Sequence, residues 1–344
     1  MLVRNYFDEE IVDEAFGLKR TLGPQASEHS VLSSRGNDPW AVVLAGGDGT
    51  RLQGLTLTIS ADCRPKQFCS FFGGKSLLSQ TRERLDPLFR RDRRLFVVTR
   101  AHQAFYRDEL QDADDSCMLV QPQNRGTGVA IAAARLRIQQ READPLVAFF
   151  PCDHFYSNED AFALSVRSAI SFAGQHPKSI VLLGAEARYP EVEYGWIEPG
   201  PGIRHASSAV PLLRENRFWE KPSLPQARAL LRRGCLWNTF VTIGQASAFL
   251  ALLRSQIPDV VLSIANAVEI NDLDFAYRGV RGIDFSREVL APRPSALLVV
   301  RDNASGWTDL GSPTRVIDTL VRNRITPAWL SGSVYRMNGG ELDA

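Results

Sequence analysis

Short apolar runs and stretches of helical periodicity alternate along much of the chain, a pattern typical of an α/β protein. Apolar runs of strand length occupy residues 41–45, 95–99, 118–121, 146–150, 180–184 and 296–300. Apolar residues at helical spacing occupy residues 76–89, 101–110, 126–140 and 224–233, and a closing helix is expected from about Pro313. Strands that alternate with helices pair in parallel through right-handed crossovers. The pattern therefore predicts a mostly parallel central sheet flanked by helices.

The second half of the chain alternates less regularly, and aromatic segments at 193–198 and 217–222 interrupt it. We expect these segments to form a smaller β region beside the sheet. No hexapeptide repeat follows, so no C-terminal β-helix is expected. The expected organisation is an N-terminal extension (1–38), a main domain (39–312) and a C-terminal helix and tail (313–344).

The N-terminal extension has one helical pattern, at residues 8–20, followed by a stretch rich in Ser, Gly and Asn. Such a segment either packs on the outside of the domain or stays loose, as chain ends often do. Binding of a partner is a third interpretation.

Composition narrows the class of protein. Of the 344 residues, 44% are hydrophobic, enough for a substantial core, and 40 basic against 39 acidic residues leave a formal net charge of +1. Without a basic excess, binding to nucleic acid or to an anionic membrane is not expected. The five cysteines are widely spaced with no CxxC pair, which favours reduced thiols and a cytoplasmic location. Neither a signal peptide nor a membrane span is expected.

The stretch 40–68 carries the strongest candidate chemistry. Its first strand ends in a glycine cluster, AGGDGTRL, with Arg51 just beyond it and Lys66 further on. Glycines allow a sharp turn whose N–H groups point into one concavity, where a phosphate can bind. A dinucleotide fingerprint is disfavoured because Leu52 stands where G-x-G-x-x-G needs its third glycine. A Walker loop is disfavoured because Cys69 replaces the first glycine of that motif.

Three segments follow the ends of predicted strands: the glycine loop, residues 121–127 and Asp153. Ligands of parallel sheets bind outside the carboxyl ends of the strands. The three segments therefore converge on one edge of the sheet and predict a ligand site there.

A set of short segments occurs in the order known from one family. AGGDGTRL and RPKQF resemble G-G-x-G-[ST]-R-L and P-K, VQPQNRGTGVAIAAA resembles E-P-x-G-R-N-T-A-P-A-I-A, and FPCDH resembles P-A-D-H. EYGWIE, FWEKP, LWNT and WTDLGS are similar to T-G-Y-G-Y-I, F-x-E-K-P, L-W-N-[ST]-G and W-x-D-[VL]-G-[ST]. The chain thus resembles the sugar-1-phosphate nucleotidyltransferases, and PKQF is most similar to the mannose-1-phosphate guanylyltransferase (GDP-mannose pyrophosphorylase) branch. The resemblance implies a Rossmann-like, GT-A-like fold with the smaller β region on its substrate side.

The resemblance also implies a reaction, the transfer of a nucleotidyl group from an NTP to a sugar 1-phosphate with Mg²⁺ and release of pyrophosphate. The second pKa of a sugar phosphate is about 6, so the nucleophile is already mostly dianionic and needs positioning and charge neutralisation, not a general base. Arg51 would hold the β- and γ-phosphates, and Lys66 would lie nearer the α-phosphate. Asp153 and Asp309 match the metal aspartates of the family and would hold Mg²⁺, which prefers oxygen ligands. His154 is expected to be structural.

Binding residues are nominated in two groups. Those for the nucleotide are Leu44, Gly46, Gly47, Gly49, Thr50, Gln121, Arg125 and Thr127. Those for the sugar phosphate are Gly195, Glu220, Lys221 and Asn238. The neighbouring Trp196, Trp219 and Trp237 are expected to pack in the core.

Several positions depart from the family pattern. Gly54 replaces a proline, and the segment 52–64 is longer than usual. One interpretation is that this segment forms a different lid over the triphosphate. Gly126 replaces an asparagine, which puts a base or ribose contact in question. Cys152 replaces an alanine and should change little.

The leading hypothesis is an enzyme that joins GTP and mannose 1-phosphate to give GDP-mannose. One alternative is the same chemistry with UTP or dTTP and glucose 1-phosphate, which the substitution at Gly126 keeps open. Another is a catalytically silent homologue that binds a nucleotide sugar and regulates something else through its N-terminal extension. The sequence does not define the number of subunits, and a homo-oligomer stays open.

Overall fold

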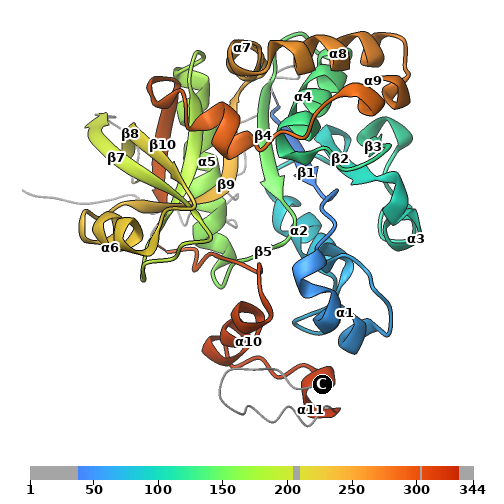
Figure 1. The fold of residues 1–344 in the computed structure, drawn as a ribbon, viewed down its shortest axis with the longest axis vertical. Helices are drawn as coiled ribbons and strands as arrows, with labels where there is room; N and C mark the ends of the chain where they lie inside the picture. Colours follow the sequence, from blue (N-terminus) through green and yellow to red (C-terminus); the bar gives the residue numbers. More distant parts are fainter. Residues whose placement is uncertain (1–37, 204–209, 303, 333–344) are drawn as a thin grey trace, which may run out of the picture. The chain divides into compact units, whose positions relative to one another are not determined.

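The central feature of the fold is a mixed sheet of nine strands (Figure 1). The computed structural model describes residues 38–203, 210–302 and 304–332. Within them the strand order is β3 (Met118–Gln121), β2 (Arg94–Thr99), β1 (Trp40–Leu44), β4 (Leu146–Pro151), β9 (Leu236–Gln245), β6 (Ile180–Glu186), β10 (Leu297–Asp302), β8 (Leu212–Glu220) and β7 (Gly195–Ile203). Strands β1 to β4 pair in parallel, as do β6 and β10, whereas β9 runs antiparallel to both β4 and β6. A separate short antiparallel pair joins β5 (His154–Phe155) to β11 (Thr308–Asp309).

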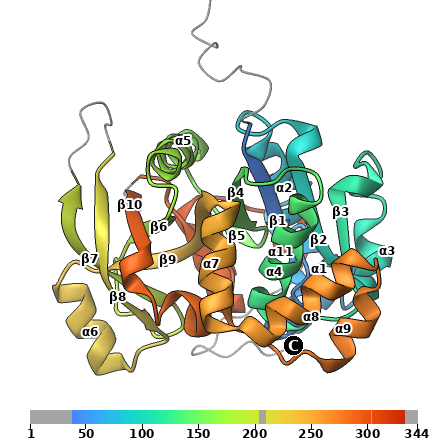
Figure 2. The same cartoon turned by 90° about the horizontal axis from the view of Figure 1, so that it is seen from above.

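The sheet is buried on both faces. Along β1, Trp40 and Val42 belong to the hydrophobic cluster of one face, whereas Ala41 and Val43 belong to that of the other. Successive strand residues point to opposite faces, so a run without polar residues suits a strand covered on both sides. Helices α4 (Gly126–Gln139), α7 (Ala246–Gln256), α8 (Pro258–Glu269) and α9 (Leu273–Gly279) supply the first cluster, and α2 (Leu77–Leu85), α5 (Glu159–Gln175) and α6 (Leu224–Arg232) supply the second. Figure 2 shows α5 and α7 on opposite sides of the strands.

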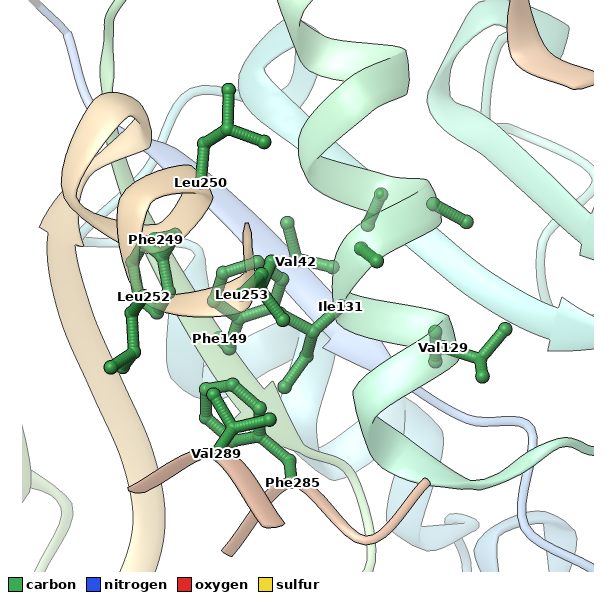
Figure 3. Packing of buried hydrophobic residues seen from close by; sticks show 14 of the residues in the cluster. Val42, Val129, Ile131, Phe149, Phe249, Leu250, Leu252, Leu253, Phe285 and Val289 are labelled. Carbon is green, nitrogen blue, oxygen red and sulfur yellow. The ribbon is translucent and has the colours of Figure 1, made fainter. Parts of the chain in front are cut away.

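Figure 3 shows how the first cluster is built. Ile131 of α4 and Phe249 of α7 pack over Val42 and Phe149 of the sheet, and Val289 of the π-helical turn Ser286–Leu290 closes the cluster. Each of these side chains is fully buried. The parallel strands are therefore held rigidly where their carboxyl ends carry the loops.

A third hydrophobic cluster joins segments near the two ends of the described chain. Helix α1 (Gln53–Ser60) contributes Leu55, and α10 (Pro313–Arg322) contributes Val316 and Leu320. The two helices lie at the same end of the sheet, where α11 (Ala328–Gly332) follows (Figure 1). The segment 52–64, for which a lid was one interpretation, is thus mainly a helix with one buried face.

The predicted α/β fold with a central sheet flanked by helices is confirmed. The helix expected at 101–110 is shorter, since α3 spans only Gln103–Tyr106. The helices α1, α5, α7, α8 and α9 were not predicted. Single helical turns occupy Thr50–Leu52, Lys66–Phe68, Arg91–Arg93, Arg100–His102, Asp115–Cys117 and Pro294–Ala296. The helix expected at 8–20 and most of the N-terminal extension lie outside the described residues.

Candidate active site

The glycine loop follows β1 and is held in place by Gln67. Gln67 Nε2 donates to the carbonyl oxygens of Ala45 (3.0 Å) and Gly47 (2.8 Å). Gly49 adopts a φ of +62°, and a Cβ at this position would stand 2.8 Å from the backbone nitrogen of Lys66. Only glycine combines this conformation with so close an approach. The loop is therefore packed directly against the segment that carries Lys66.

A second loop, residues 121–127, faces the glycine loop. Asn124 Nδ2 donates to Asp48 Oδ2 of the glycine loop (3.0 Å), and Asn124 Oδ1 accepts from the N–H of Gly126 (2.9 Å). Gly126 begins α4 with a φ of +80°, and a Cβ there would collide with the carbonyl group of Ile283. The glycine at this position is thus explained by packing against the segment around Ile283.

Two adjoining cavities lie at these loops and share Leu44, Gly47 and Asp153. The first has a volume of about 310 Å³ and is lined by Leu44, Gly46, Gly47, Val97, Gln121, Asn124, Gly126, Thr127, Ala130, Pro151, Asp153, His154 and Phe240. The second has a volume of about 200 Å³ and is lined by Leu44, Gly47, Gly49, Thr50, Arg51, Leu52, Lys66, Gln67, Cys152, Asp153 and Gly311. The first is mainly apolar with a few polar groups, whereas the second contains both predicted cations, Arg51 and Lys66.

Lys66 and Asp153 form an ion pair between the loops. Lys66 Nζ lies 3.0 Å from Asp153 Oδ2 and donates to the carbonyl oxygen of Leu310 (3.1 Å). Burial alone would raise the pKa of Asp153, but the Lys66 ammonium more than offsets this, so the pKa lies below its ordinary value. Asp153 is therefore a carboxylate at neutral pH.

His154 contacts this pair from the adjacent position. Trp307 Nε1 donates to His154 Nδ1 (3.1 Å), and because an indole nitrogen only donates, Nδ1 carries no proton. Burial lowers the pKa of His154 despite the neighbouring carboxylates. The ring is therefore neutral at pH 7, with its proton on Nε2, which lies 3.7 Å from Asp153 Oδ1.

Asp309 reaches the site through the short sheet. The pairing of β11 with β5 sets Asp309 opposite His154, next to Asp153 in the chain. Asp309 Oδ1 accepts from the N–H of Gly311 (3.1 Å) and from the Arg315 guanidinium. Two aspartates that lie far apart in sequence are thus brought to neighbouring positions.

Arg51 lies on the more exposed rim of the second cavity. Its Nη1 is 2.8 Å from Glu193 Oε2, and the two side chains are 59% and 47% exposed. An exposed ion pair adds little stability. An anionic ligand can therefore replace Glu193 at Arg51 at small cost.

The donor set suits a hard divalent cation that is held jointly with phosphate. In the part of the chain that the structure describes, no group of three or more His, Cys, Asp or Glu side chains could hold a metal ion alone. Mg²⁺ is commonly bound by one or two carboxylates together with substrate phosphates. Asp153 and Asp309 offer that pair of carboxylates beside the second cavity.

The residues predicted for the sugar phosphate lie outside both cavities: Gly195, Glu220, Lys221 and Asn238. Gly195 pairs with Glu220 between β7 and β8, and a Cβ there would stand 2.9 Å from Glu220 Oε2. Burial, with the Asp284 charge, raises the pKa of Glu220 to about 7. Asn238 Oδ1 accepts from the N–H of Phe240 (3.0 Å), which lines the first cavity. Asn238 is thus placed just behind that cavity.

Most of the predicted nucleotide and catalytic residues line the cavities; Arg125 and Asp309 do not. Arg125 Nε instead donates to the carbonyl oxygen of Tyr277 (3.1 Å). Sequence patterns assigned no role to Gln67, although it stands inside the RPKQF segment. They also missed Arg315 and Tyr277, which no motif marks.

A glycine loop, a lysine–aspartate pair and a second aspartate at the carboxyl edge of parallel strands are features of α/β proteins that bind phosphorylated ligands. A family model described as "Nucleotidyl transferase" matches residues 40–322. The chain belongs to this family.

Relatives of known sequence include the xanthan biosynthesis protein XanB of Xanthomonas campestris pv. campestris (strain B100), which is 31% identical over 295 residues. The match covers 82% of this chain and 59% of XanB. The mannose-1-phosphate guanylyltransferase ManC of Salmonella typhimurium is 29% identical over 284 residues, which are 79% of this chain and 58% of ManC. The chain therefore spans about three fifths of the length of these relatives.

Solved structures agree with the fold. A crystal structure from Thermus thermophilus, named as a mannose-1-phosphate geranyltransferase, superposes with a TM-score of 0.70 at 28% identity over 80% of this chain and 76% of the other. A Helicobacter pylori structure named as a mannose-6-phosphate isomerase shares the fold, with a TM-score of 0.62 at 22% identity and coverage of 79% and 100%. The predicted nucleotidyltransferase fold is thus confirmed. None of the helices in the described ranges is long and apolar enough to cross a membrane.

Proposed function

We propose that the protein is a nucleotidyltransferase that joins GTP and mannose 1-phosphate to give GDP-mannose and pyrophosphate. The observation that carries the proposal is the Lys66–Asp153 ion pair in a cavity lined by the glycine loop, with Asp309 paired through β11 and β5 to His154, the residue after Asp153. The choice of GTP and mannose 1-phosphate is supported by the names of relatives that are 27% to 29% identical, from Escherichia coli K12 and Salmonella typhimurium.

The reaction joins two polyanions. A phosphate oxygen of mannose 1-phosphate forms a bond to the α-phosphorus of GTP, and the bond from that phosphorus to the bridging oxygen of the β-phosphate breaks, so pyrophosphate leaves with the electron pair. The main obstacle is repulsion between the dianionic nucleophile and the triphosphate. Groups that hold both reactants in line and neutralise their charge therefore supply the catalysis.

The side chains of the second cavity suit this task. Lys66 is positioned by Asp153 and by the Leu310 carbonyl, so its ammonium is held between the two loops. Arg51, at the rim, would exchange Glu193 for the β- and γ-phosphates. N–H groups of the glycine loop would add neutral donors.

Asp153 and Asp309 would hold Mg²⁺, which when bound neutralises phosphate charge. To bind the ion, Asp153 would share with it an oxygen that faces Lys66, and Asp309 would share an oxygen that faces Arg315. Asp153 is ionised at neutral pH because its pKa is lowered, so no proton has to leave before the ion binds.

The first cavity would hold the base and ribose, and Gly195, Glu220, Lys221 and Asn238 would contact the sugar phosphate. Burial raises the pKa of Glu220 to about 7, so the charge of this side chain changes near neutral pH and sugar-phosphate binding should depend on pH there. The proximity of Asn238 to Phe240 supports a sugar subsite next to the base cavity.

The test is to incubate the purified protein with each of GTP, UTP, dTTP and ATP, a panel of sugar 1-phosphates and Mg²⁺, and to measure pyrophosphate. We expect release with GTP and mannose 1-phosphate above all other pairs. Release of pyrophosphate only with UTP or dTTP and glucose 1-phosphate would show that the substrates are assigned wrongly, while the proposed mechanism would still stand. Binding of GDP-mannose without turnover of any pair would instead indicate a silent regulator.

A further inference from the structure

Tyr277 of helix α9 is tied to the loop that lines the first cavity, although it does not line the cavity itself. Its hydroxyl lies 3.0 Å from Gln121 Oε1, across 156 residues of sequence. Its carbonyl oxygen accepts from Gln123 Nε2 (2.7 Å) and from Arg125 Nε (3.1 Å). Three hydrogen bonds thus fasten one residue of α9 to the segment 121–125.

The buried hydroxyl determines which end of the Gln121 amide faces the cavity. The Tyr277 side chain is completely buried, so its proton must find an acceptor within the protein. Among the described residues, Gln121 Oε1 is the acceptor that it has. If the amide were reversed, Nε2 would donate to the phenol and the phenolic proton would be left without a partner. The satisfied arrangement therefore has Oε1 toward Tyr277 and Nε2 away from it.

The amide nitrogen consequently lies at the cavity wall. A Cβ on Gly46 would stand 2.7 Å from Gln121 Nε2, which places this nitrogen beside the glycine loop that lines the same cavity. Within the described chain no protein acceptor is hydrogen-bonded to Nε2. The cavity therefore presents a fixed N–H donor from a residue that is itself 3% exposed.

A fixed donor discriminates among bases. Guanine presents O6, and uracil and thymine present O4, as acceptors, whereas adenine and cytosine present N6 and N4 amino groups at the corresponding positions. An amino group opposite a buried N–H donor leaves both donors unsatisfied, which a site with a fixed amide penalises.

We propose that Tyr277 is a positioning residue that sets base selectivity: it locks the Gln121 amide so that the cavity accepts bases with a keto oxygen and rejects those with an amino group. This deepens the proposed function and rests on the first cavity being the base site. The selectivity is for keto over amino bases, so it holds whether the preferred nucleotide is GTP or UTP.

The test measures equilibrium binding of GTP, UTP, ATP and CTP, each with Mg²⁺, to the wild-type protein and to Tyr277→Phe, which removes the hydroxyl and keeps the ring. The wild type should bind the better keto nucleotide at least about tenfold more tightly than either amino nucleotide. In Tyr277→Phe the freed amide can turn, so this ratio should fall by roughly five- to tenfold. Turnover at saturating substrates should change less than the ratio does. Tyr106→Phe, at another buried tyrosine outside the site, is the matched control and should keep the wild-type ratio.

The variant Gln121→Met distinguishes an effect of Tyr277 on the Gln121 amide from a general loosening of the loop. If Tyr277 acts through the amide, Tyr277→Phe changes the ratio in the wild-type background and leaves it unchanged in Gln121→Met. An equal keto-to-amino ratio in wild type and Tyr277→Phe overturns the inference, as does an equal loss in both backgrounds. Keto-selective binding that depends on Tyr277, in a protein that releases no pyrophosphate, would support the inference while refuting the proposed enzyme.

Discussion

The charged side chains of the site face one another in pairs. Lys66 and Asp153 are 14% and 28% exposed, whereas Arg51 and Glu193 are 59% and 47% exposed. Solvent screens the outer pair more strongly, so Glu193 is the easier partner to replace. A triphosphate is therefore expected to meet Arg51 first and the Lys66–Asp153 pair afterwards.

Outside the site, the buried carboxyl group of Glu215 lowers the free energy of unfolding at high pH, where it becomes charged. Glu215 of β8 is 6% exposed, and neither carboxylate oxygen has a hydrogen-bond partner among the described residues. Burial raises its pKa from 4.5 to about 8. Between these values the folded protein binds a proton that the unfolded chain has lost, so the free energy of unfolding falls as the pH rises from about 4.5 through about 8.

We therefore expect Glu215→Gln to be more stable than the wild type by a few kcal/mol at pH 9 and to differ much less at pH 5. Urea unfolding curves at both pH values measure the difference. The exposed Glu269→Gln is the control and should behave as the wild type does at each pH. A Glu215→Gln advantage that is the same at pH 5 and pH 9 would contradict the assignment.

At the level of elements, the cluster between α1 and α10 links the side of the candidate site that carries Arg51 to the end of the described chain. Leu320 is 1% exposed and packs in that cluster with Leu55, whereas Val321, the next residue of α10, is 70% exposed. The helix that follows Arg51 is thus stabilised by a helix that follows Asp309.

Leu320→Ala should lower the free energy of unfolding by about 2–4 kcal/mol, because it leaves a cavity in a buried cluster. Amide hydrogen exchange in α1 should become faster as well. Val321→Ala removes a similar group from the exposed face of the same helix and should change neither quantity appreciably. Unchanged exchange in α1 would show that the two helices are not energetically coupled.

Sequence patterns predicted β1, β2, β3, β4, β6 and β10 because their apolar runs end at clear turn residues, but they did not predict the buried strand β9. The strand predicted at 118–121 coincides with β3, and Gly126 opens α4 as expected. The segment 52–64 is harder to predict, because the cluster that buries Leu55 of α1 includes Val316 and Leu320, which lie far away in the chain, besides nearer residues such as Phe71. Propensity is a weak guide when distant packing decides the structure.

The same distinction applies to the site. Glycines, Lys66 and the aspartates stand in short patterns that a single sequence reveals. Tyr277 contacts Gln121 across 156 residues of sequence, and Arg315 contacts Glu191 of a distant segment as well as the nearby Asp309; neither residue has a local pattern. Contacts between residues so far apart are decided by topology, which periodicity does not encode.

On the scale of the whole molecule, ligand binding should stabilise the folded state of the described domain. The proposed site combines Asp153 with Asp309, so a bound ligand would hold two sequence-distant parts of the chain together. GTP with Mg²⁺ should raise the thermal unfolding midpoint of the wild type, because a ligand that binds only the folded state shifts the equilibrium toward it. In Asp153→Asn, Mg²⁺ should no longer raise the unfolding midpoint above the value reached with GTP alone, and turnover should fall at least about a hundredfold. Differential scanning fluorimetry and the pyrophosphate assay measure the two effects.

Asp108→Asn, an exposed aspartate outside the site, is the control and should retain the full effect of Mg²⁺ on the midpoint. An undiminished effect of Mg²⁺ on Asp153→Asn, with near-normal turnover, would remove Asp153 from the metal site.

The pairing of β5 with β11 has a consequence for how the proposed activity would arise during folding. Strands β1 to β4 come from the first half of the chain, but Asp309 joins Asp153 only after β11 has been synthesised and docked. Such a non-local closure is slow relative to the formation of local structure. A refolding chain should thus regain most of its secondary structure before it regains catalysis, so that the return of activity marks the docking of a two-residue strand.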